Sequence, residues 1–309
     1  MARAASPSPP SLQERYAGAL VGLACGDALG TTVEFKPRGS FVALRDITGR
    51  GPFALRAGQW TDDTSMAMCL AESLVEKRYD VHDQMTRYLR WWREGYWSAT
   101  GRCFDIGHTT RAALERFERD ASPYAGSAEP DTAGNGSLMR LAPVVLYFHP
   151  SAEDVLRYAA DQSLTTHAAP EAVECCQLLA HALSRALAGL GKEILLDGAL
   201  AWLREDRVAA IAAGEFRAKP IAAIRGSGYA VESLEAALWC VHHTATYQDA
   251  VLTAANLGDD ADTTAAIAGQ LAGALYGVEA IPKEWRQVLH RREDILALAR
   301  RLFGASRTR

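Results

Sequence analysis

Two short acidic segments, about 200 residues apart, carry the residue types most suited to chemistry. Residues 60–65 read Trp-Thr-Asp-Asp-Thr-Ser and residues 258–264 read Gly-Asp-Asp-Ala-Asp-Thr-Thr, and each directly precedes an apolar run with helical spacing. Aspartate and threonine at a helix start can simply cap the helix. Capping needs only one acceptor, however, whereas several adjacent carboxylates repel one another. The repeated pattern therefore indicates a bound cation.

The donor types favour a hard divalent cation. Asp260 and Asp262 would point about 200° apart within a helix, so they converge only at a loop-to-helix junction, with Thr263 in the first turn. Carboxylate and hydroxyl oxygens suit Mg²⁺ or Mn²⁺, and the carboxylates of Asp62, Asp63, Asp260 and Asp262 match the charge of two such ions.

Two other kinds of acidic metal site known from proteins do not match the spacing of these acids. The twelfth position of an EF-hand loop would be Gln270 or Leu271, not the required glutamate. Isoprenoid-diphosphate enzymes carry their acids at i and i+4 within a helix, whereas the acids here form DD and DxD patterns at helix starts.

The elements that position these acids are expected to be helices. In Pro170 to Leu187, for example, apolar side chains recur on one face. Sustained strand alternation is absent from the sequence. We therefore predict an all-α, single-domain fold over residues 11–305, preceded by a disordered tail at 1–10 that is rich in proline and serine. The other predicted helices cover about 12–29, 62–78, 82–95, 107–118, 137–148, 151–163, 192–204, 228–243, 246–256, 263–276 and 283–303.

Composition excludes several classes of protein. The 309 residues are 49% hydrophobic and 23% charged, with a net charge of −4 and no basic block, so a nucleic-acid or anionic-membrane binder is not expected. The N-terminus lacks the apolar core of a signal peptide, and the six cysteines include no CxxC pair. We expect a cytoplasmic, monomeric protein without a disulfide framework or a zinc site.

Seven motifs lie in order along nearly the whole chain. They are Gly26-Asp27-Ala28-Leu29-Gly30 with Glu34, residues 58–64, Phe104-Asp105-Ile106-Gly107, residues 134–140, Thr165-Thr166-His167, Gly226-Ser227-Gly228-Tyr229 and residues 258–269. Together these motifs resemble the ADP-ribosylglycohydrolase family. The resemblance implies an orthogonal helical bundle with a central dinuclear Mg²⁺ or Mn²⁺ cleft, and it implies metal ligands at Thr61, Asp62, Asp63, Asp260, Asp262 and Thr263.

Two carboxylates outside the acidic segments are candidates for catalysis. Cleavage of a glycosidic C–N bond passes through an oxocarbenium-like state and needs a positioned water and a proton for the leaving group. With the resemblance, Glu34 is the expected general acid/base or water-orienting group rather than a solvated loop residue. Asp105 orients either the substrate ribose or the backbone of the next helix.

Two glycine-rich turns and one histidine are candidates for binding the substrate. Flexible backbone N–H groups just before a helix can hold a phosphate, so the turn Asn135-Gly136-Ser137 is the expected diphosphate cradle. Gly228 and Tyr229 repeat this arrangement, and Tyr229 either stacks on adenine or packs on a neighbour. His167 either contacts the ligand or is a capping or core residue.

The activity implied by the resemblance is removal of ADP-ribose from arginine side chains of modified proteins. Two other functions fit the same residues. One is a two-metal phosphoester or pyrophosphate hydrolase. The other is a non-catalytic ADP-ribose-binding protein, which the complete set of metal-ligand types disfavours. The expected partners are an ADP-ribosylated protein or ADP-ribose. Serine-linked and small-molecule ADP-ribose remain alternative substrates.

Overall fold

A computed structural model describes residues 9–308, so most of the predicted tail lies outside the described residues. The first helix, α1 (Leu12–Gly30), starts at a capping box. The Ser11 hydroxyl accepts the backbone N–H of Glu14 at 3.3 Å, and the Glu14 carboxylate accepts the backbone N–H of Ser11 at 2.7 Å. Local sequence therefore fixes the start of the helix that the rest of the fold surrounds.

The regular secondary structure of the described chain, residues 9–308, is helical: it contains no strand, only three isolated bridges. This confirms the all-α prediction. After α1 the helices are α2 (Asp62–Lys77), α3 (Val81–Glu94), α4 (His108–Asp120), α5 (Ala142–Phe148), α6 (Ala152–Leu164), α7 (Pro170–Leu187), α8 (Asp206–Ala212), α9 (Ala230–His243), α10 (Tyr247–Ala255), α11 (Ala261–Tyr276), α12 (Lys283–Val288) and α13 (Arg292–Ser306).

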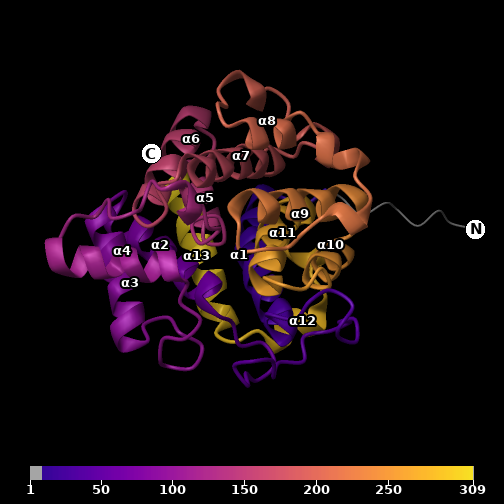
Figure 1. The fold of residues 1–309 in the computed structure, drawn as a ribbon, viewed down its shortest axis with the longest axis horizontal. Coiled ribbons are helices and arrows are strands. Elements are labelled where there is room, and N and C mark those ends of the chain that lie inside the picture. Colours follow the sequence, from indigo (N-terminus) through magenta and orange to yellow (C-terminus); the bar gives the residue numbers. More distant parts are fainter. Residues whose placement is uncertain (1–8, 309) are drawn as a thin grey trace, which may run out of the picture.

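Helices α1 and α11 lie side by side at the centre of the molecule (Figure 1). Their backbones touch because small residues face each other: a Cβ on Gly22 would lie 2.3 Å from the carbonyl oxygen of Gly269, and a Cβ on Gly18 would lie 2.1 Å from that of Gly273. The pairing runs in opposite directions, so the helices are antiparallel. The C-terminal end of α1 therefore lies beside the first turn of α11.

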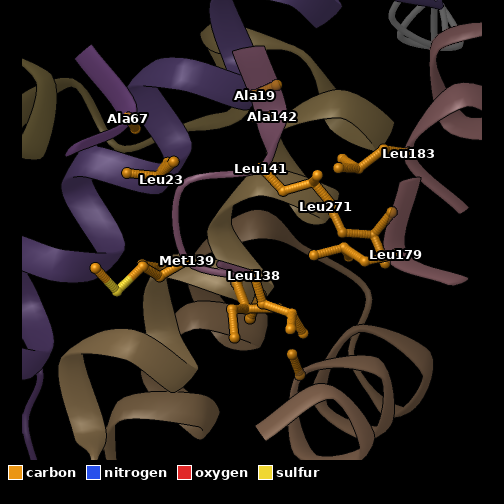
Figure 2. Close-up of a cluster of buried hydrophobic side chains, with 14 of the residues drawn as sticks. Ala19, Leu23, Ala67, Leu138, Met139, Leu141, Ala142, Leu179, Leu183 and Leu271 are labelled. Atoms are coloured by element: carbon orange, nitrogen blue, oxygen red, sulfur yellow. The ribbon is translucent and has the colours of Figure 1, made fainter. Parts of the chain in front are cut away.

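An apolar core surrounds this pair. Figure 2 shows Leu23 of α1 and Leu271 of α11 among buried side chains from α2, α5 and α7, including Leu179 and Leu183. The segment Leu12–Val33 is long and apolar enough to cross a membrane by length and composition, but 89% of its most apolar window is buried inside the fold. Its hydrophobicity therefore reflects its place in the core.

Several predicted helix boundaries were wrong. Residues 192–204 form 3₁₀ turns, Lys192–Ile194 and Ala199–Ala201, interrupted by Gly198 at φ +84°. The predicted helix 283–303 is two helices, α12 and α13, separated at Arg291, whose φ is +48°. The predicted helix 137–148 begins only at Ala142, and α8 was not predicted. Apolar spacing alone does not separate a helix from a run of turns: Leu195 and Leu196 are buried, whereas Ile194 and Leu200 of the same segment are 40% and 54% exposed.

Candidate functional site

Three helix ends meet at one side of the central pair. The loop after α1 carries Glu34, the first turn of α2 carries the acids 62–63, and the first turn of α11 follows Asp260. Between them lies a cleft of about 740 Å³. The predicted site residues that line this cleft are Glu34, Asp62, Asp105, Asn135, Gly136, His167, Gly228, Asp260, Asp262 and Thr263.

A carboxylate that belongs to one of the quoted motifs, but to which the sequence analysis assigned no role, organises the start of α2. Asp27 is fully buried in α1, and it accepts hydrogen bonds from the backbone N–H and the hydroxyl of both Thr61 and Thr64, at 2.6 to 3.0 Å. It therefore caps α2 from another helix. An aspartate inside an otherwise apolar helix was the available signal, because a buried charge needs partners.

Five carboxylates form two groups that share one member. Carboxylate oxygens of Asp27, Asp63 and Asp262 lie within 4.8 Å of one another, and so do those of Glu34, Asp260 and Asp262. Asp262 belongs to both groups. These five carboxylates would be the ones to hold divalent cations, whose charge would offset the repulsion between them.

The chemistry of the donors fits divalent cations. Asp63 is fully buried, and its Oδ1 has no hydrogen-bond partner in the described structure. The Thr61 hydroxyl lies 3.0 Å from the other oxygen of Asp63 and 3.4 Å from Asp262. Among the described residues that line the cleft, none is a lysine or arginine that could neutralise these acids. Hard oxygen donors with unbalanced negative charge are the setting in which proteins bind Mg²⁺ or Mn²⁺.

The six predicted metal ligands are thus brought together from opposite ends of the sequence. Asp62, Asp260, Asp262 and Thr263 line the cleft, whereas Thr61 and Asp63 lie beneath its surface. Asp62 belongs to neither close carboxylate group, whereas Asp27 and Glu34 do. The predicted ligand set remains a prediction, to which the geometry adds Asp27 and Glu34 as candidates.

Burial and mutual repulsion disturb the titration of these acids. Burial, followed by nearby carboxylates, raises the pKa values of Asp62, Asp63 and Asp262 well above the usual range. Burial also raises the pKa of Asp27 to about 6, although its four hydrogen bonds from threonines oppose the shift. A divalent cation bound to these carboxylates would favour their deprotonated form and so oppose the rise in pKa.

Glu34 is a buried residue of the cleft, only 4% exposed. Its Oε2 accepts the backbone N–H groups of Ala261 at 2.8 Å and Asp262 at 3.3 Å, so it caps α11. Burial and the neighbouring Asp260 carboxylate raise the pKa of Glu34 to about 8. A carboxyl group that titrates near neutral pH can take or give a proton under physiological conditions.

The loop that carries Glu34 is fixed at several points. Phe35 donates its backbone N–H to the carbonyl of Asp259 at 2.8 Å, and Asp259 donates its own to Lys36. The Arg38 guanidinium donates to the carbonyls of Leu257, Ile221 and Ile224. These hydrogen bonds hold the loop, and with it the carboxylate of Glu34, beside the start of α11.

Asp105 faces the same cleft from the segment before α4. Its φ of +57° is a backbone conformation that side chains rarely adopt, and it turns the residue into the lining. Burial, then Asp260, raises the pKa of Asp105 to about 7. Its position is compatible with contact to a bound ligand, which was one of the two predicted alternatives.

The residues of the turn Asn135-Gly136-Ser137 make different contacts. Asn135 donates to Asp260 and to the Ser233 hydroxyl, both at 2.8 Å, and so orients a predicted metal ligand. Within residues 9–308 no acceptor is recorded for the backbone N–H of Gly136 or Ser137. The Ser137 side chain is fully buried and accepts from Ser163, so only the backbone of this residue is suited to the predicted cradle.

Two of the three remaining predicted binding residues line the cleft, and one does not. His167 and Gly228 line the cleft. Tyr229 does not: its hydroxyl donates to Glu171, and its ring lies beside Arg207. The predicted stacking of Tyr229 on adenine stays a prediction, and its observed contacts match the alternative in which it packs on neighbours.

An aromatic group at the cleft was not anticipated from the sequence. Phe35 lines the cleft, is 64% exposed and has a φ of +64°. Its ring centroid lies 6.0 Å from that of Phe53, which lies 5.3 Å from that of Phe104. The three rings come from separate segments of the chain, so no local sequence pattern predicts that they lie together. Of these three rings, that of Phe35 lines the cleft, as Glu34 and Asp105 do, and gives it an apolar, electron-rich face.

A family model provides an independent comparison. The model described as ADP-ribosylglycohydrolase matches residues 8–309. A solved structure described as an ADP-ribosylglycohydrolase-related protein complex superposes with a TM-score of 0.86 at 45% identity and covers 96% of this chain and 99% of its own.

Curated relatives agree with the family model. The ADP-ribosylarginine hydrolase Tri1 of Pseudomonas putida is 49% identical over 302 residues, which cover 97% of this chain and 81% of the relative. The ADP-ribosyl-[dinitrogen reductase] glycohydrolase of Rhodospirillum rubrum is 33% identical and covers 94% of this chain and 98% of its own. Both relatives are named as hydrolases that act on ADP-ribosylated substrates, and both match more than nine-tenths of this chain.

Proposed function

Because this chain belongs to the ADP-ribosylglycohydrolase family and is a glycohydrolase, we propose that it cleaves the N-glycosidic bond between ADP-ribose and arginine side chains of modified proteins. Two divalent cations, Mg²⁺ or Mn²⁺, are the proposed cofactors. The observation that carries the proposal is the pair of carboxylate groups that share Asp262 at the bottom of the cleft. The cations would supply positive charge that polarises bound oxygens.

The protein's own residues account for the proton transfers in this proposal. Hydrolysis breaks the bond between the anomeric carbon and the guanidine nitrogen, joins a water oxygen to that carbon, and moves one proton to the leaving nitrogen. Glu34 would accept the proton of the attacking water or deliver one to the guanidine, since its carboxyl group lines the cleft beside Asp260 and Asp262. Asp105 would hold the ribose.

The cleft also has features suited to the rest of ADP-ribose. The backbone N–H groups of Gly136 and Ser137 would receive the diphosphate, since Gly136 lines the cleft and neither N–H group has an acceptor in the described chain. His167 and Gly228 line the cleft beside this turn and would contact the ribose or phosphate there. Tyr229 would reach adenine only if its hydrogen bond to Glu171 were released.

The choice of arginine rests on the rim of the cleft. A guanidinium group is cationic and planar, so it is attracted both to carboxylates and to the face of an aromatic ring. Phe35 offers such a ring next to Glu34. The curated relative with 49% identity is named an arginine hydrolase, which supports the same choice. A serine-linked substrate would leave this aromatic surface without a cationic partner.

One experiment separates the three functions. Purified protein is incubated with arginine-linked and serine-linked ADP-ribosylated proteins, each with Mg²⁺, Mn²⁺ or neither, and the products are resolved. Release of intact ADP-ribose from the arginine-linked protein, dependent on metal, is the expected result. Release of AMP or ribose phosphate would identify a two-metal pyrophosphate hydrolase instead. Tight binding of ADP-ribose with no turnover in either metal would identify a binding protein.

A further inference from the structure

A buried arginine lies beneath the histidine of the cleft. Arg140 is completely buried, and no carboxylate pairs with it in the described residues 9–308. Its guanidinium lies 4.6 Å from the centre of the Tyr88 ring and donates to the Gln162 side chain. Burying a cation without an ionic partner costs free energy, so its hydrogen bonds must stabilise the charge.

Those hydrogen bonds lead to the cleft. Nη2 of Arg140 lies 2.7 Å from the Thr166 hydroxyl, and that hydroxyl lies 2.8 Å from Nδ1 of His167. All three residues are at least nine-tenths buried. The hydrogen bonds therefore form a continuous chain from the buried guanidinium to the imidazole.

The direction of the chain follows from its first member. A guanidinium has only donors, so the Thr166 oxygen must accept from Arg140. The single hydroxyl proton of Thr166 then has Nδ1 of His167 as its acceptor. An imidazole whose Nδ1 accepts a hydrogen bond carries its proton on Nε2. The reverse orientation would leave a buried hydroxyl proton without an acceptor.

The other nitrogen of the ring lies by the glycine turn. A Cβ on Gly136 would lie 3.1 Å from Nε2 of His167, and a Cβ on Gly134 would lie 3.3 Å from it. Both glycines and His167 line the cleft, and no acceptor for Nε2 is recorded within the described chain. Burial and the charge of Arg140 lower the pKa of His167 to about 3, which keeps the ring neutral.

We propose that Arg140 and Thr166 are positioning residues that fix His167 as a neutral imidazole whose Nε2–H points into the cleft, as a donor to an oxygen of the ligand. The identity of that ligand, ADP-ribose, rests on the proposed function. The fixed tautomer does not, because it is a property of the free protein. A neutral donor suits this place, because a positive imidazolium would compete with the cations expected nearby.

The neighbouring threonine provides a matched control. Thr165 also accepts from Arg140, at 3.1 Å, but donates its own hydroxyl proton to the Gln162 carbonyl and not to the histidine. Thr165→Val and Thr166→Val therefore remove the same group, from adjacent buried positions on the same arginine. Only the second breaks the connection to the ring. Thr166→Ser keeps the hydroxyl and should restore it.

The tautomer can be read directly by ¹⁵N NMR of protein labelled at histidine, with the His167 signals assigned by their loss in His167→Gln. We expect an unprotonated Nδ1 and a protonated Nε2 in the free protein across about pH 5 to 8, the range in which an ordinary histidine titrates. The same state should persist in Thr165→Val and Thr166→Ser. In Thr166→Val a population with the proton on Nδ1 should appear.

Calorimetry with ADP-ribose measures the consequence. Thr166→Val should weaken ADP-ribose binding by about tenfold relative to Thr165→Val, as expected when one buried donor is misplaced. A wild-type ring protonated on Nδ1, or on both nitrogens, would overturn the proposal. Equal tautomers and equal affinities in the two valine variants would overturn it as well. If wild-type protein failed to bind ADP-ribose, the proposed function would fail, and the NMR result would still decide the tautomer.

Discussion

Glu34 accepts the backbone N–H of Ala261 at 2.8 Å, although 227 positions separate the two residues in sequence. The loop that follows α1 thereby caps α11, the helix that α1 packs against. The same carboxylate lies within 4.8 Å of the acids Asp260 and Asp262. Glu34 therefore combines a structural hydrogen bond with a place among the candidate catalytic acids, and a useful variant must preserve the first while removing the second.

Glu34→Gln meets this requirement, because the amide oxygen can still accept from Ala261 while the titratable group is lost. We expect kcat to fall by about 10²-fold or more, with metal and ADP-ribose binding almost normal. Steady-state kinetics and calorimetry on the same preparation test this. Glu14→Gln, which changes a half-buried capping glutamate at the start of α1, is the matched control and should retain activity. Near-normal kcat in Glu34→Gln would make Asp105 the next candidate, and loss of metal binding would make Glu34 a ligand.

Asp262→Asn should lower metal affinity and turnover together, because Asp262 belongs to both carboxylate groups. A loss of about tenfold or more in metal affinity is expected from removal of a charged ligand. Asp259→Asn is the control: it is exposed, belongs to neither group and has a φ of +58° that asparagine tolerates. Titration of metal-free protein with Mn²⁺ measures both variants. Similar affinities in the two would contradict the role assigned to Asp262.

Stabilisation by metal should increase with pH. The pKa values of Asp27, Asp105 and Glu34 are raised to about 6, 7 and 8, above the ordinary values of about 4 in an unfolded chain. The folded metal-free protein thus binds more protons than the unfolded chain between about pH 4 and 8. The stability that these groups contribute is present below about pH 4 and is lost as pH rises through 6 to 8.

A divalent cation needs the same carboxylates deprotonated, so it replaces protons more readily at high pH. The increase in Tm on adding millimolar Mn²⁺ or Mg²⁺ should therefore be larger at pH 8 than at pH 5, as measured by differential scanning calorimetry. An increase that is the same at both pH values, or no increase at all, would contradict the metal site.

Gly22→Ala should destabilise the fold strongly. Its Cβ would lie 2.3 Å from the carbonyl oxygen of Gly269, and the obstacle is backbone, which cannot move aside without separating α1 from α11. We expect a loss of about 3 kcal/mol or more in the free energy of unfolding, measured with urea. Gly304→Ala in α13 meets nothing within 4 Å and should instead stabilise by about 0.5 to 1 kcal/mol. Equal changes in the free energy of unfolding for the two variants would rule out close backbone contact as the reason why position 22 requires glycine.

Phe35→Leu tests the rim of the cleft. Leucine keeps an apolar side chain but lacks the aromatic face, so KM for an arginine-linked substrate should rise about two- to fivefold, while the affinity for free ADP-ribose stays unchanged. Val42→Leu, at an exposed position in the same loop, is the control. An equal loss for both ligands would show that Phe35 contacts ADP-ribose and not the guanidinium.

Local sequence determined the helical fold and the two acidic segments. The spacing of apolar residues marked α1, α7 and α11, because helical periodicity depends only on residues three and four apart. Asp62 and Asp63, like Asp260 and Asp262, are so near in sequence that their carboxylates repel each other, and this local repulsion indicated a cation. The motif resemblance added Glu34, Asp105, Gly136 and His167, all of which line the cleft.

Only the tertiary structure decided which distant groups share a partner. Asp27 reaches Thr61 and Thr64 because α1 and α2 are packed together, and Asp262 joins two carboxylate groups because α1 and α11 run antiparallel with touching backbones. Tyr229 bonds to Glu171 instead of lining the cleft for the same kind of reason. Hydrogen bonds and repulsion between carboxylates act over a few ångströms in space. A one-dimensional sequence does not encode that proximity until the helices have packed.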